Sequence, residues 1–309
     1  VNEVTQFKDF EAMPVHCFES MHRAFLKVQD GCNQFCSYCA IPFARGRERS
    51  LNHEQVIQIA KDLCDKGHTE IVLTGIHTGR YDDGEYDLAK LMKALLENTP
   101  DSVYYRISSI EITEVSDALI ALMKENPRMC HHLHIPVQSA CNETLRRMNR
   151  PYTIEEFKEK INYIRSCIPD ISISTDVIAG FVQESDEEFE TTYENLADLE
   201  LSFFHVFPYS KRNGTKASTL KGEINGKVAK ARVARLLELS NACRERDMKR
   251  FNPVQVLIER KQDGYYTGYT NQYHSCKILS DTPLSGRITI EWDRIEDGTY
   301  YGKKDVVCD

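Results

Sequence analysis

The chain has 309 residues, a net charge of −8 and 41% hydrophobic residues, which is enough for one domain of roughly 200–250 residues with a small appendage. It contains no apolar run long enough to cross a membrane, and its polar, mixed-charge start, VNEVTQFKDF, is unlike a signal peptide. A pI of 5.8 argues against strong non-specific binding to nucleic acid, although local basic patches can still bind it.

The first expected strand, residues 24–31, leads into a loop with three cysteines, Cys32, Cys36 and Cys39, in the stretch GCNQFCSYC. A closed zinc site has four ligands, and an electron-transfer cluster usually has four thiolates, but no fourth cysteine follows nearby. Three thiolates hold three irons of a [4Fe-4S] cluster and leave the fourth iron open. The chemistry best known to need an open iron is the reductive cleavage of S-adenosylmethionine (SAM), whose amino and carboxylate groups chelate it.

The alternative for this loop is a zinc site completed by a distant histidine or cysteine. The chain has eleven cysteines in all. This odd number, without a small secreted scaffold, fits thiols kept reduced in a cytosol better than it fits disulfides. We therefore expect a cytoplasmic protein. Cysteines such as Cys64 and Cys243 have no ligand-like spacing and are expected to pack as small hydrophobic residues.

Beyond the cysteine loop, amphipathic helices alternate with short apolar strands up to residue 210. Gly67 ends one helix, and the pairs Thr153 with Glu156 and Ser185 with Glu188 are capping boxes that begin two others. The expected helices cover 53–67, 88–99, 116–126, 142–149, 153–168 and 184–200. The expected strands cover 24–31, 69–75, 102–111, 131–139, 170–180 and 201–210.

Strands that alternate with helices predict parallel pairing through right-handed crossovers. Six such units are fewer than the eight of a closed TIM barrel, so we expect an α/β fold with an open, partial (β/α)6 barrel over residues 24–251. In parallel α/β folds, ligands bind at the carboxyl ends of the strands. The cysteine loop follows the first strand, so it is expected at that end.

A helix over residues 227–250, whose basic residues are typical of a solvated face, precedes a change of composition. Residues 252–309 are rich in Tyr, Gly and β-branched residues, and the turn signals Asp263-Gly264 and Asp297-Gly298 predict a small β-barrel. Barrels of this kind often bind RNA. Seven Lys and Arg against nine Asp and Glu give this segment a charge of −2, so charge alone does not indicate RNA binding.

At this point the motifs resemble the radical-SAM methylthiotransferases, and within that family the branch that acts on N6-threonylcarbamoyladenosine in bacterial tRNA. The resemblance runs from about Phe25 to the C-terminus and ends in a tail similar to a TRAM domain, which is expected to bind RNA. The matching segments are DGCNQFCSYCAIPFARGRERS, IVLTGIHTG, RISSIEITEV, HLHIPVQS, LRRMNRPYT, ISISTDVIAGF and FFHVFPYSKRNGT.

The resemblance implies a reaction, its cofactors and its partners. A deoxyadenosyl radical abstracts hydrogen from C2 of the modified adenosine beside the anticodon, and a methylthio group is then installed there. One SAM supplies the radical and another supplies the methyl group. The implied partners are the tRNA anticodon stem-loop and a cellular reductant such as flavodoxin or ferredoxin, and the expected oligomeric state is a monomer.

The resemblance also implies site residues. Cys32, Cys36 and Cys39 match the cluster ligands, and Tyr38 would pack beside the adenosyl group. The positions expected to contact SAM or substrate lie mostly at strand ends: Thr74, Gly75, His77, Ser109, Glu111, Gln138, Ser139, Ser174, Asp176, Phe207, Pro208 and Tyr209. The positions expected to grip RNA phosphates are Arg45, Arg47 and Arg49.

Closely spaced histidines at 131, 132 and 134 suggest a metal site at first sight. On a strand, His132 and His134 share one face and His131 takes the other, and no Asp, Glu or Cys lies close in sequence to complete a ligand set. We therefore do not expect these histidines to bind a metal.

The sequence departs from the family pattern at three places. Where the family often has QSGSD this chain has Ala140 and Cys141, and where it has GFPGET this chain has Val182 and Gln183, which suggests changed loops near the SAM site. Family members also carry an N-terminal domain with three cysteines for a second [4Fe-4S] cluster. Residues 1–23 are expected to be a linker remnant of that domain, so this chain alone should cleave SAM without completing thiolation.

Two other functions remain open from the sequence. One is a radical-SAM enzyme that modifies RNA without thiolation. The other is a non-catalytic RNA-binding module with a structural Fe-S or zinc site, whose RNA binding would be independent of Cys36 and of SAM.

Overall fold

The computed structural model describes residues 22–304, so most of the expected linker remnant lies outside the described residues. Strands and helices alternate as predicted. The parallel strands are β1 (Arg23–Asp30), β3 (Glu70–Gly75), β4 (Tyr104–Ile107), β5 (His132–His134), β6 (Ser172–Ala179) and β7 (Phe203–Pro208). The helices that follow them are α2 (His53–Asp65), α3 (Leu88–Asn98), α4 (Asp117–Glu125), α5 (Asn142–Arg147), α6 (Ile154–Cys167) and α7 (Asp186–Asp198). Two short elements, α1 (Ile41–Arg45) and β2 (Arg49–Ser50), follow the cysteine loop.

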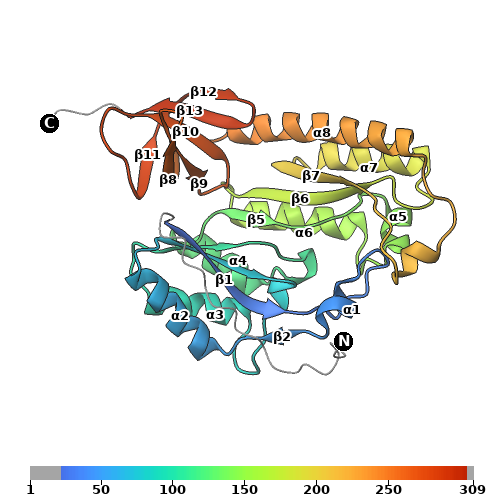
Figure 1. The fold of residues 1–309 in the computed structure, drawn as a ribbon, viewed down its shortest axis with the longest axis horizontal. Helices are drawn as coiled ribbons and strands as arrows, with labels where there is room; N and C mark the ends of the chain where they lie inside the picture. Colours follow the sequence, from blue (N-terminus) through green and yellow to red (C-terminus); the bar gives the residue numbers. More distant parts are fainter. Residues whose placement is uncertain (1–21, 305–309) are drawn as a thin grey trace.

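The parallel strands form two sheets side by side, β1-β3-β4 with β2 at its edge and β5-β6-β7. Between β4 and β5 the backbone bonds are sparse: Cys130 N donates to Tyr105 O over 2.8 Å, and Ile110 N donates to His134 O over 3.0 Å. Within residues 22–304 no ladder joins β1 to β7, so the barrel is open on that side (Figure 1). The expected partial barrel is confirmed.

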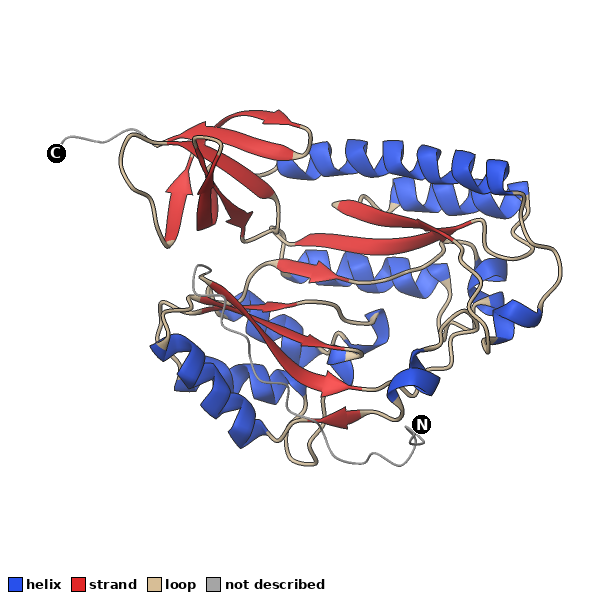
Figure 2. Cartoon of the chain, viewed as in Figure 1, coloured by secondary structure: helices blue, strands red, loops and turns tan. Residues whose placement is uncertain are grey.

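Alternation along the strands separates a helix-facing side from an inner side. In β6, Ile173 and Val177 are buried in the main hydrophobic core, whereas Ser174 and Asp176 take the other face. Figure 2 shows the helices on the outside of the strands. The capping boxes predicted at Thr153 and Ser185 are both present, and they begin α6 and α7. Polar side chains that would be costly in the core can therefore line the inside.

Two strands end earlier than predicted. β4 stops at Ile107 rather than 111, and β5 stops at His134 rather than 139. Pro136 lacks a backbone N–H and interrupts the ladder after β5, although Gln138 bonds to β6 again. The segments beyond both strands are loops, and they carry several of the expected site residues.

The helix α8 (Gly226–Met248) runs along β7 into a second, all-β unit (Figure 1). This unit, the C-terminal barrel, contains β8 (Val254–Gln262), β9 (Tyr265–Thr270), β10 (Ser275–Leu279), β11 (Arg287–Ile290), β12 (Trp292–Glu296) and β13 (Thr299–Lys303). Its strand order is β11-β8-β9-β10-β13-β12. Only Glu291 separates the two edge strands, so they are halves of one bent segment and the sheet curls into a small barrel, as predicted.

The C-terminal barrel closes the amino end of the larger barrel. Its loop 271–274 places Tyr273 against the inner face, with the ring 5.1 Å from that of His132 and the Arg106 guanidinium 4.8 Å from the Tyr273 ring centre. Arg106 also donates to Asn271 O and Thr270 O, over 2.9 and 3.2 Å. Access to the inner face from this end is therefore blocked by packed side chains.

A buried carboxylate holds this junction together. Glu70 is fully buried and contacts Arg23 Nε at 2.9 Å, Arg106 Nε at 3.0 Å and a terminal nitrogen of Arg287 at 2.7 Å. Burial alone would raise the pKa of Glu70, but the three guanidinium groups hold this pKa far below its usual value. Arg287 belongs to the C-terminal barrel, so the network fastens the two barrels to each other.

None of the helices within residues 22–304 is long and apolar enough to span a bilayer.

We expect Glu70→Gln to lower the free energy of unfolding by about 3–5 kcal/mol, because it leaves buried guanidinium groups uncompensated. The matched control is Glu97→Gln, which removes an exposed pair with Lys93 and should change little. Chemical denaturation at neutral pH measures both. Equal stability of the two variants would contradict the role given to Glu70.

The same network predicts a pH dependence. Since the pKa of Glu70 is depressed in the folded state, its contribution is fully present above its unfolded pKa of about 4.3 and is lost as the pH falls further. The stability difference between wild type and Glu70→Gln should therefore shrink below roughly pH 4, as measured by denaturation across that range.

Candidate active site

The cysteine loop lies at the carboxyl end of β1, and its backbone is fixed by neighbouring segments. Gly31 has φ +76°, and a Cβ there would lie 2.0 Å from Arg47 O, so only glycine fits. Cys32 N donates to Gly46 O over 3.1 Å, and Cys39 N donates to Cys36 O over 3.0 Å. Ser37 N donates to Met148 O over 2.9 Å, which ties the loop to the end of α5.

The three thiols gather on this loop and are partly exposed. Burial raises the pKa of the Cys39 thiol, and the nearby sulfur atoms of Cys36 and Cys32 raise it further. Gln34 N donates to Cys32 Sγ over 3.3 Å, and a terminal nitrogen of Arg150 donates to Cys36 Sγ over 3.4 Å. Three convergent sulfur donors with N–H groups directed at two of them fit a three-cysteine iron–sulfur cluster.

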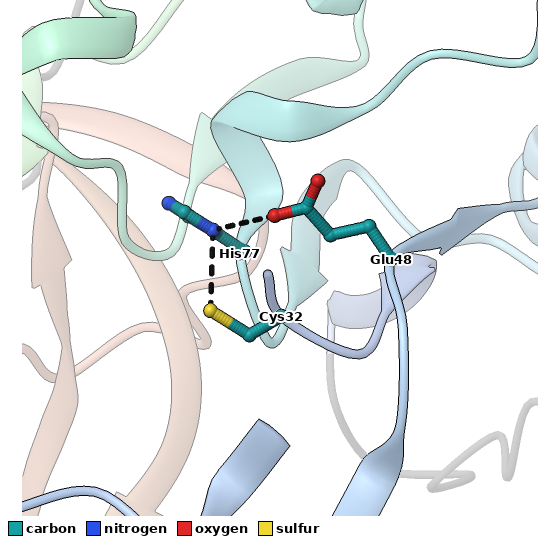
Figure 3. Close-up of side chains that lie close together, drawn as sticks. All are labelled: Cys32, Glu48 and His77. Carbon is teal, nitrogen blue, oxygen red and sulfur yellow. Dashed lines mark hydrogen bonds and ion pairs between the residues drawn. The ribbon is translucent and has the colours of Figure 1, made fainter. Parts of the chain in front are cut away.

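His77 lies beside the first cysteine (Figure 3). Its Nδ1 is 3.5 Å from Cys32 Sγ and 3.2 Å from Glu48 Oε1, and its Nε2 is 2.7 Å from Glu114 Oε1. Burial alone would lower the pKa of His77, but these three neighbours raise it to about 12. The carboxylates of Glu48 and Glu114 thus favour the protonated form of His77 beside Cys32.

Cys32, Glu48 and His77 are also close enough to share a metal ion, which is relevant to the zinc alternative. In the described part of the chain, the sulfur atoms of Cys36 and Cys39 do not join that set. A zinc ion there would use only one of the three loop cysteines, so the cluster accounts better for their spacing.

A residue that the sequence analysis missed, Arg150, occupies the centre of the site. Its guanidinium donates to Cys36 Sγ, to Glu111 Oε2, to Tyr152 Oη over 2.7 Å and to Pro136 O over 3.1 Å. Its side chain is almost fully buried. The signal that could have indicated it is its place in LRRMNRPYT, a segment matched by the resemblance.

The site thus presents opposite charges next to the cysteine loop. Glu111 follows β4 and Arg150 follows α5, so two loops bring together residues 39 positions apart. Tyr38 packs edge-to-face on Phe181 with ring centres 6.4 Å apart, and burial raises the pKa of its hydroxyl. Ser109 lies half-buried in the same loop as Glu111.

The expected residues at the ends of β3 and β5 occupy different environments. Thr74 and Gly75 are partly exposed, and a Cβ on Gly75 would lie 3.0 Å from Gln29. Gln138 has φ +67°, and its backbone bonds on both sides of Val177 join it to β6. The Ser139 hydroxyl is fully buried and pairs with Thr192 Oγ1 at 3.1 Å, so it points away from the inner face.

The inner face of β5, β6 and β7 carries a polar row that sequence reasoning did not assemble. His134 Nε2 is 3.2 Å from Asp176 Oδ1, and His205 lies opposite Asp176 in the register of β6 and β7. The Ser174 hydroxyl contacts both His132 and His134, at 3.0 and 2.9 Å. The predicted sharing of one face by His132 and His134 is confirmed.

The earlier conclusion that no acid completes a histidine set was limited to the local sequence. In space, Asp176 joins His134 and His205 in a group whose ligand atoms lie within 4.8 Å of one another. Phe207, two residues beyond His205, is half exposed, and Tyr209 packs edge-to-face on Phe181 at 5.0 Å. This row offers hydrogen bonds and ring surfaces to a ligand at the carboxyl ends of the strands.

The three arginines after the loop differ in their contacts. Arg49 donates to Asp30 Oδ2 over 2.8 Å and to the carbonyls of Arg45 and Arg47, so it stabilises the loop. Arg45 is exposed, and Arg47 is also exposed with its guanidinium 5.8 Å from the Phe35 ring centre.

The residues at the family departures are packed or hydrogen-bonded. Ala140 and Val182 are buried, and Cys141 Sγ lies 3.1 Å from Glu143 Oε2. Gln183 keeps a left-handed φ of +64° at the position where the family has glycine, and its side chain donates to Lys221 O over 2.9 Å.

Comparison with known proteins agrees with this geometry. The family described as the radical SAM superfamily matches residues 26–196. "Threonylcarbamoyladenosine tRNA methylthiotransferase MtaB" of Bacillus subtilis is 37% identical over 93% of this chain and 66% of its own length. The protein of the same name from Chlamydia pneumoniae is 34% identical over 97% of this chain and 71% of its length.

A relative whose name gives a different substrate is "tRNA-2-methylthio-N(6)-dimethylallyladenosine synthase" of Thermodesulfovibrio yellowstonii. It is 36% identical over 84% of this chain and 61% of its own length. The chain thus spans about two thirds of the length of these relatives. Among solved structures, coproporphyrinogen III oxidase HemN of Escherichia coli gives a TM-score of 0.54 at 16% identity, over 74% of this chain and 54% of that one. Methylornithine synthase PylB gives 0.52 at 14% identity, over 72% and 62%, and both likenesses concern the fold alone.

We expect Gly31→Ala to reduce the iron retained after anaerobic reconstitution severalfold, because its Cβ would collide with Arg47 O and displace the cysteine loop. Gly84→Ala is the matched control, since Gly84 has a similar φ of +93° but nothing within 4 Å. Iron counting on both folded variants tests this. Full iron content in Gly31→Ala would show that the loop tolerates the displacement.

Proposed function

The chain belongs to the radical SAM superfamily and, within it, to the tRNA methylthiotransferase family, and from this premise we propose that it carries the radical-forming part of such an enzyme. The observation that carries the proposal is the convergence of the three loop cysteines with the pair Arg150 and Glu111 at the carboxyl end of β1.

When bound by Cys32, Cys36 and Cys39, a [4Fe-4S] cluster would offer SAM an open iron and the electron that splits it into methionine and a deoxyadenosyl radical. The chain's own residues prepare the site for this. Arg150 and His77 each direct a cation at one cysteine sulfur, which offsets the charge of the thiolates.

The pair Arg150 and Glu111 matches the two charged groups of an amino acid. A guanidinium is a good partner for a carboxylate, and a carboxylate accepts hydrogen bonds from an ammonium group. We assign Arg150 to the carboxylate of SAM and Glu111 to its amino group. Without a ligand the two side chains pair with each other, so both charges remain compensated.

The inner face would then hold the adenosine part. Asp176 is partly exposed on β6, beside His134, and its carboxylate can accept hydrogen bonds from ribose hydroxyls. Phe207 and Tyr38 offer ring surfaces to the adenine. Gln138 lies at the level of Val177, within reach of the same ligand.

We further propose that the substrate is N6-threonylcarbamoyladenosine in a tRNA anticodon stem-loop and that the reaction occurs at its C2 atom. Support comes from the names of the relatives matched over most of this chain. Arg45 and Arg47, exposed beside the site, would contact RNA phosphates together with the C-terminal barrel. A cytoplasmic reductant would supply the electron, and the methylthio group would require a second cluster outside residues 22–304.

The first test is anaerobic reconstitution with iron and sulfide, followed by iron counting, EPR with and without SAM, and detection of 5′-deoxyadenosine. We expect about four irons, a spectrum shifted by SAM, and deoxyadenosine formation. Cys36→Ala should abolish all three, whereas Cys64→Ala should retain them because Cys64 packs against the core. Iron that is retained without any response to SAM would refute the proposal.

Adding tRNA to the same preparation tests whether this chain cleaves SAM without completing thiolation. Complete methylthiolation by residues 1–309 alone would contradict the assignment of thiolation to a further cluster.

A second prediction concerns Arg150. Arg150→Met should weaken SAM binding by roughly tenfold to a hundredfold, because hydrogen bonds between charged groups contribute about 1.5–3 kcal/mol. Arg146→Met is the control, since this exposed residue lies one turn earlier on the same segment. The SAM-induced EPR change, titrated against SAM concentration, measures the effect. Unchanged affinity with an intact cluster would remove Arg150 from SAM binding.

A further inference from the structure

One arginine on α8 is held in place without a partner for its charge. The Arg244 guanidinium lies 4.4 Å from the ring centre of Phe203, which takes the inner face of β7. On its other side the chain passes Gly298 of the C-terminal barrel, where a Cβ would lie 2.7 Å from Arg244 Cδ and 3.2 Å from one terminal nitrogen. Glycine at 298 therefore allows the side chain to lie between the two barrels.

Arg244 differs in this respect from the other arginines of α8. Arg232 pairs with Glu184 and Asp186, Arg235 with Glu190, and Arg246 with Glu200. Among residues 22–304, no carboxylate lies within ion-pair distance of Arg244, and its Nε is buried without an acceptor. Burial accordingly lowers the pKa of this guanidinium. A fixed, half-buried cation with an unused donor is suited to an anionic ligand.

Through Phe203, Arg244 adjoins the inner face of the larger barrel, and on its other side it lines a hollow with Glu245 and Asp297. His205 is exposed, and its ring lies 5.3 Å from that of Phe203. Burial lowers the pKa of His205, and the neighbouring His134 and Arg244 lower it further. A neutral imidazole can donate one hydrogen bond. The nearby carboxylate of Asp176 is already paired with His134, so it leaves the Arg244 charge uncompensated.

The position of Arg244 suits the binding of the substrate better than the binding of SAM. Phe203 lies four residues before Phe207 on β7, which is roughly 13 Å along a strand, toward the amino end and away from the cysteine loop. Arg150 already offers a cation at the cysteine level. Arg244, a second cation near the amino end of β7, is therefore placed to bind a different negative group.

The substrates that appear in the names of two relatives differ in whether the N6 substituent carries a negative charge. A threonylcarbamoyl substituent on N6 carries a free carboxylate, whereas a dimethylallyl substituent is uncharged. We infer that Arg244, with His205 beside it, binds the carboxylate of the threonylcarbamoyl group and so selects the charged substrate over the uncharged one. The inference rests on the proposed function and adds its specificity-determining residues.

The experiment compares anticodon stem-loop RNAs that differ only at the modified adenosine. They carry the threonylcarbamoyl group, its methyl ester, or the dimethylallyl group, and their binding to the reconstituted chain is measured by fluorescence anisotropy. The wild type should bind the acid more tightly than the ester. Arg244→Met should weaken binding of the acid by roughly tenfold to a hundredfold and leave the ester nearly unchanged, and Arg244→Lys should restore part of the preference.

Two controls distinguish carboxylate binding by Arg244 from other roles of this residue. Arg246→Met, on the same helix but exposed, should keep the preference, and thermal melting confirms that each variant is folded. An equal loss of affinity for all three RNAs would assign Arg244 to a backbone phosphate, and no loss for any RNA would assign it to packing. Either result overturns the inference.

Failure of the proposed function gives a different pattern. If the wild type forms deoxyadenosine from SAM but Arg244→Met keeps the acid-to-ester preference, only the inference fails. If the wild type neither holds iron nor cleaves SAM, the proposed function fails, and the binding preference is still measured independently.

Discussion

The buried carboxylate of Glu70 is the constraint on which the arrangement of the two barrels depends. Its charge is compensated by guanidinium groups from β1, β4 and β11, so these three segments must meet before the carboxylate can leave water without a large penalty. The three guanidinium groups meet Glu70 near the amino ends of the parallel strands. The C-terminal barrel, which supplies Arg287, is therefore attached to the larger barrel at that end. The carboxyl ends remain free for the cysteine loop and the residues around it.

Charge is handled differently at the opposite end. Around the cysteines, each cation is shared: Arg150 contacts Glu111 and Cys36 Sγ, and His77 contacts Glu114 and Cys32 Sγ. Without a ligand, the carboxylates compensate the charge of these two side chains. Both side chains can still donate hydrogen bonds to thiolates or to an amino acid. At Arg244 no carboxylate of residues 22–304 provides this compensation, and the side chain packs between the Phe203 ring and Gly298.

The parts of the molecule that sequence reasoning could predict are those specified locally. The capping boxes at Thr153 and Ser185 began helices where expected, and the cysteine spacing indicated the loop because its chemistry lies within nine residues. The predicted ends of β4 and β5 were wrong. For β5 the apolar pattern continues past Pro136, although the regular ladder stops at His134. The pairing of His134 with Asp176, and of Arg150 with Glu111, depends on strand register and loop packing, which no local pattern encodes.

The Tyr273 contact has a consequence for how a nucleotide can reach the inner face. Since Tyr273 and Arg106 pack at the amino end and no ladder joins β1 to β7 within residues 22–304, the open side between these strands offers a lateral route to the inner face. A base that enters sideways has to leave its stack and rotate out of the RNA, at a cost of a few kcal/mol that is smallest in a loop. The architecture therefore favours adenosines that are already unpaired, whatever their sequence context.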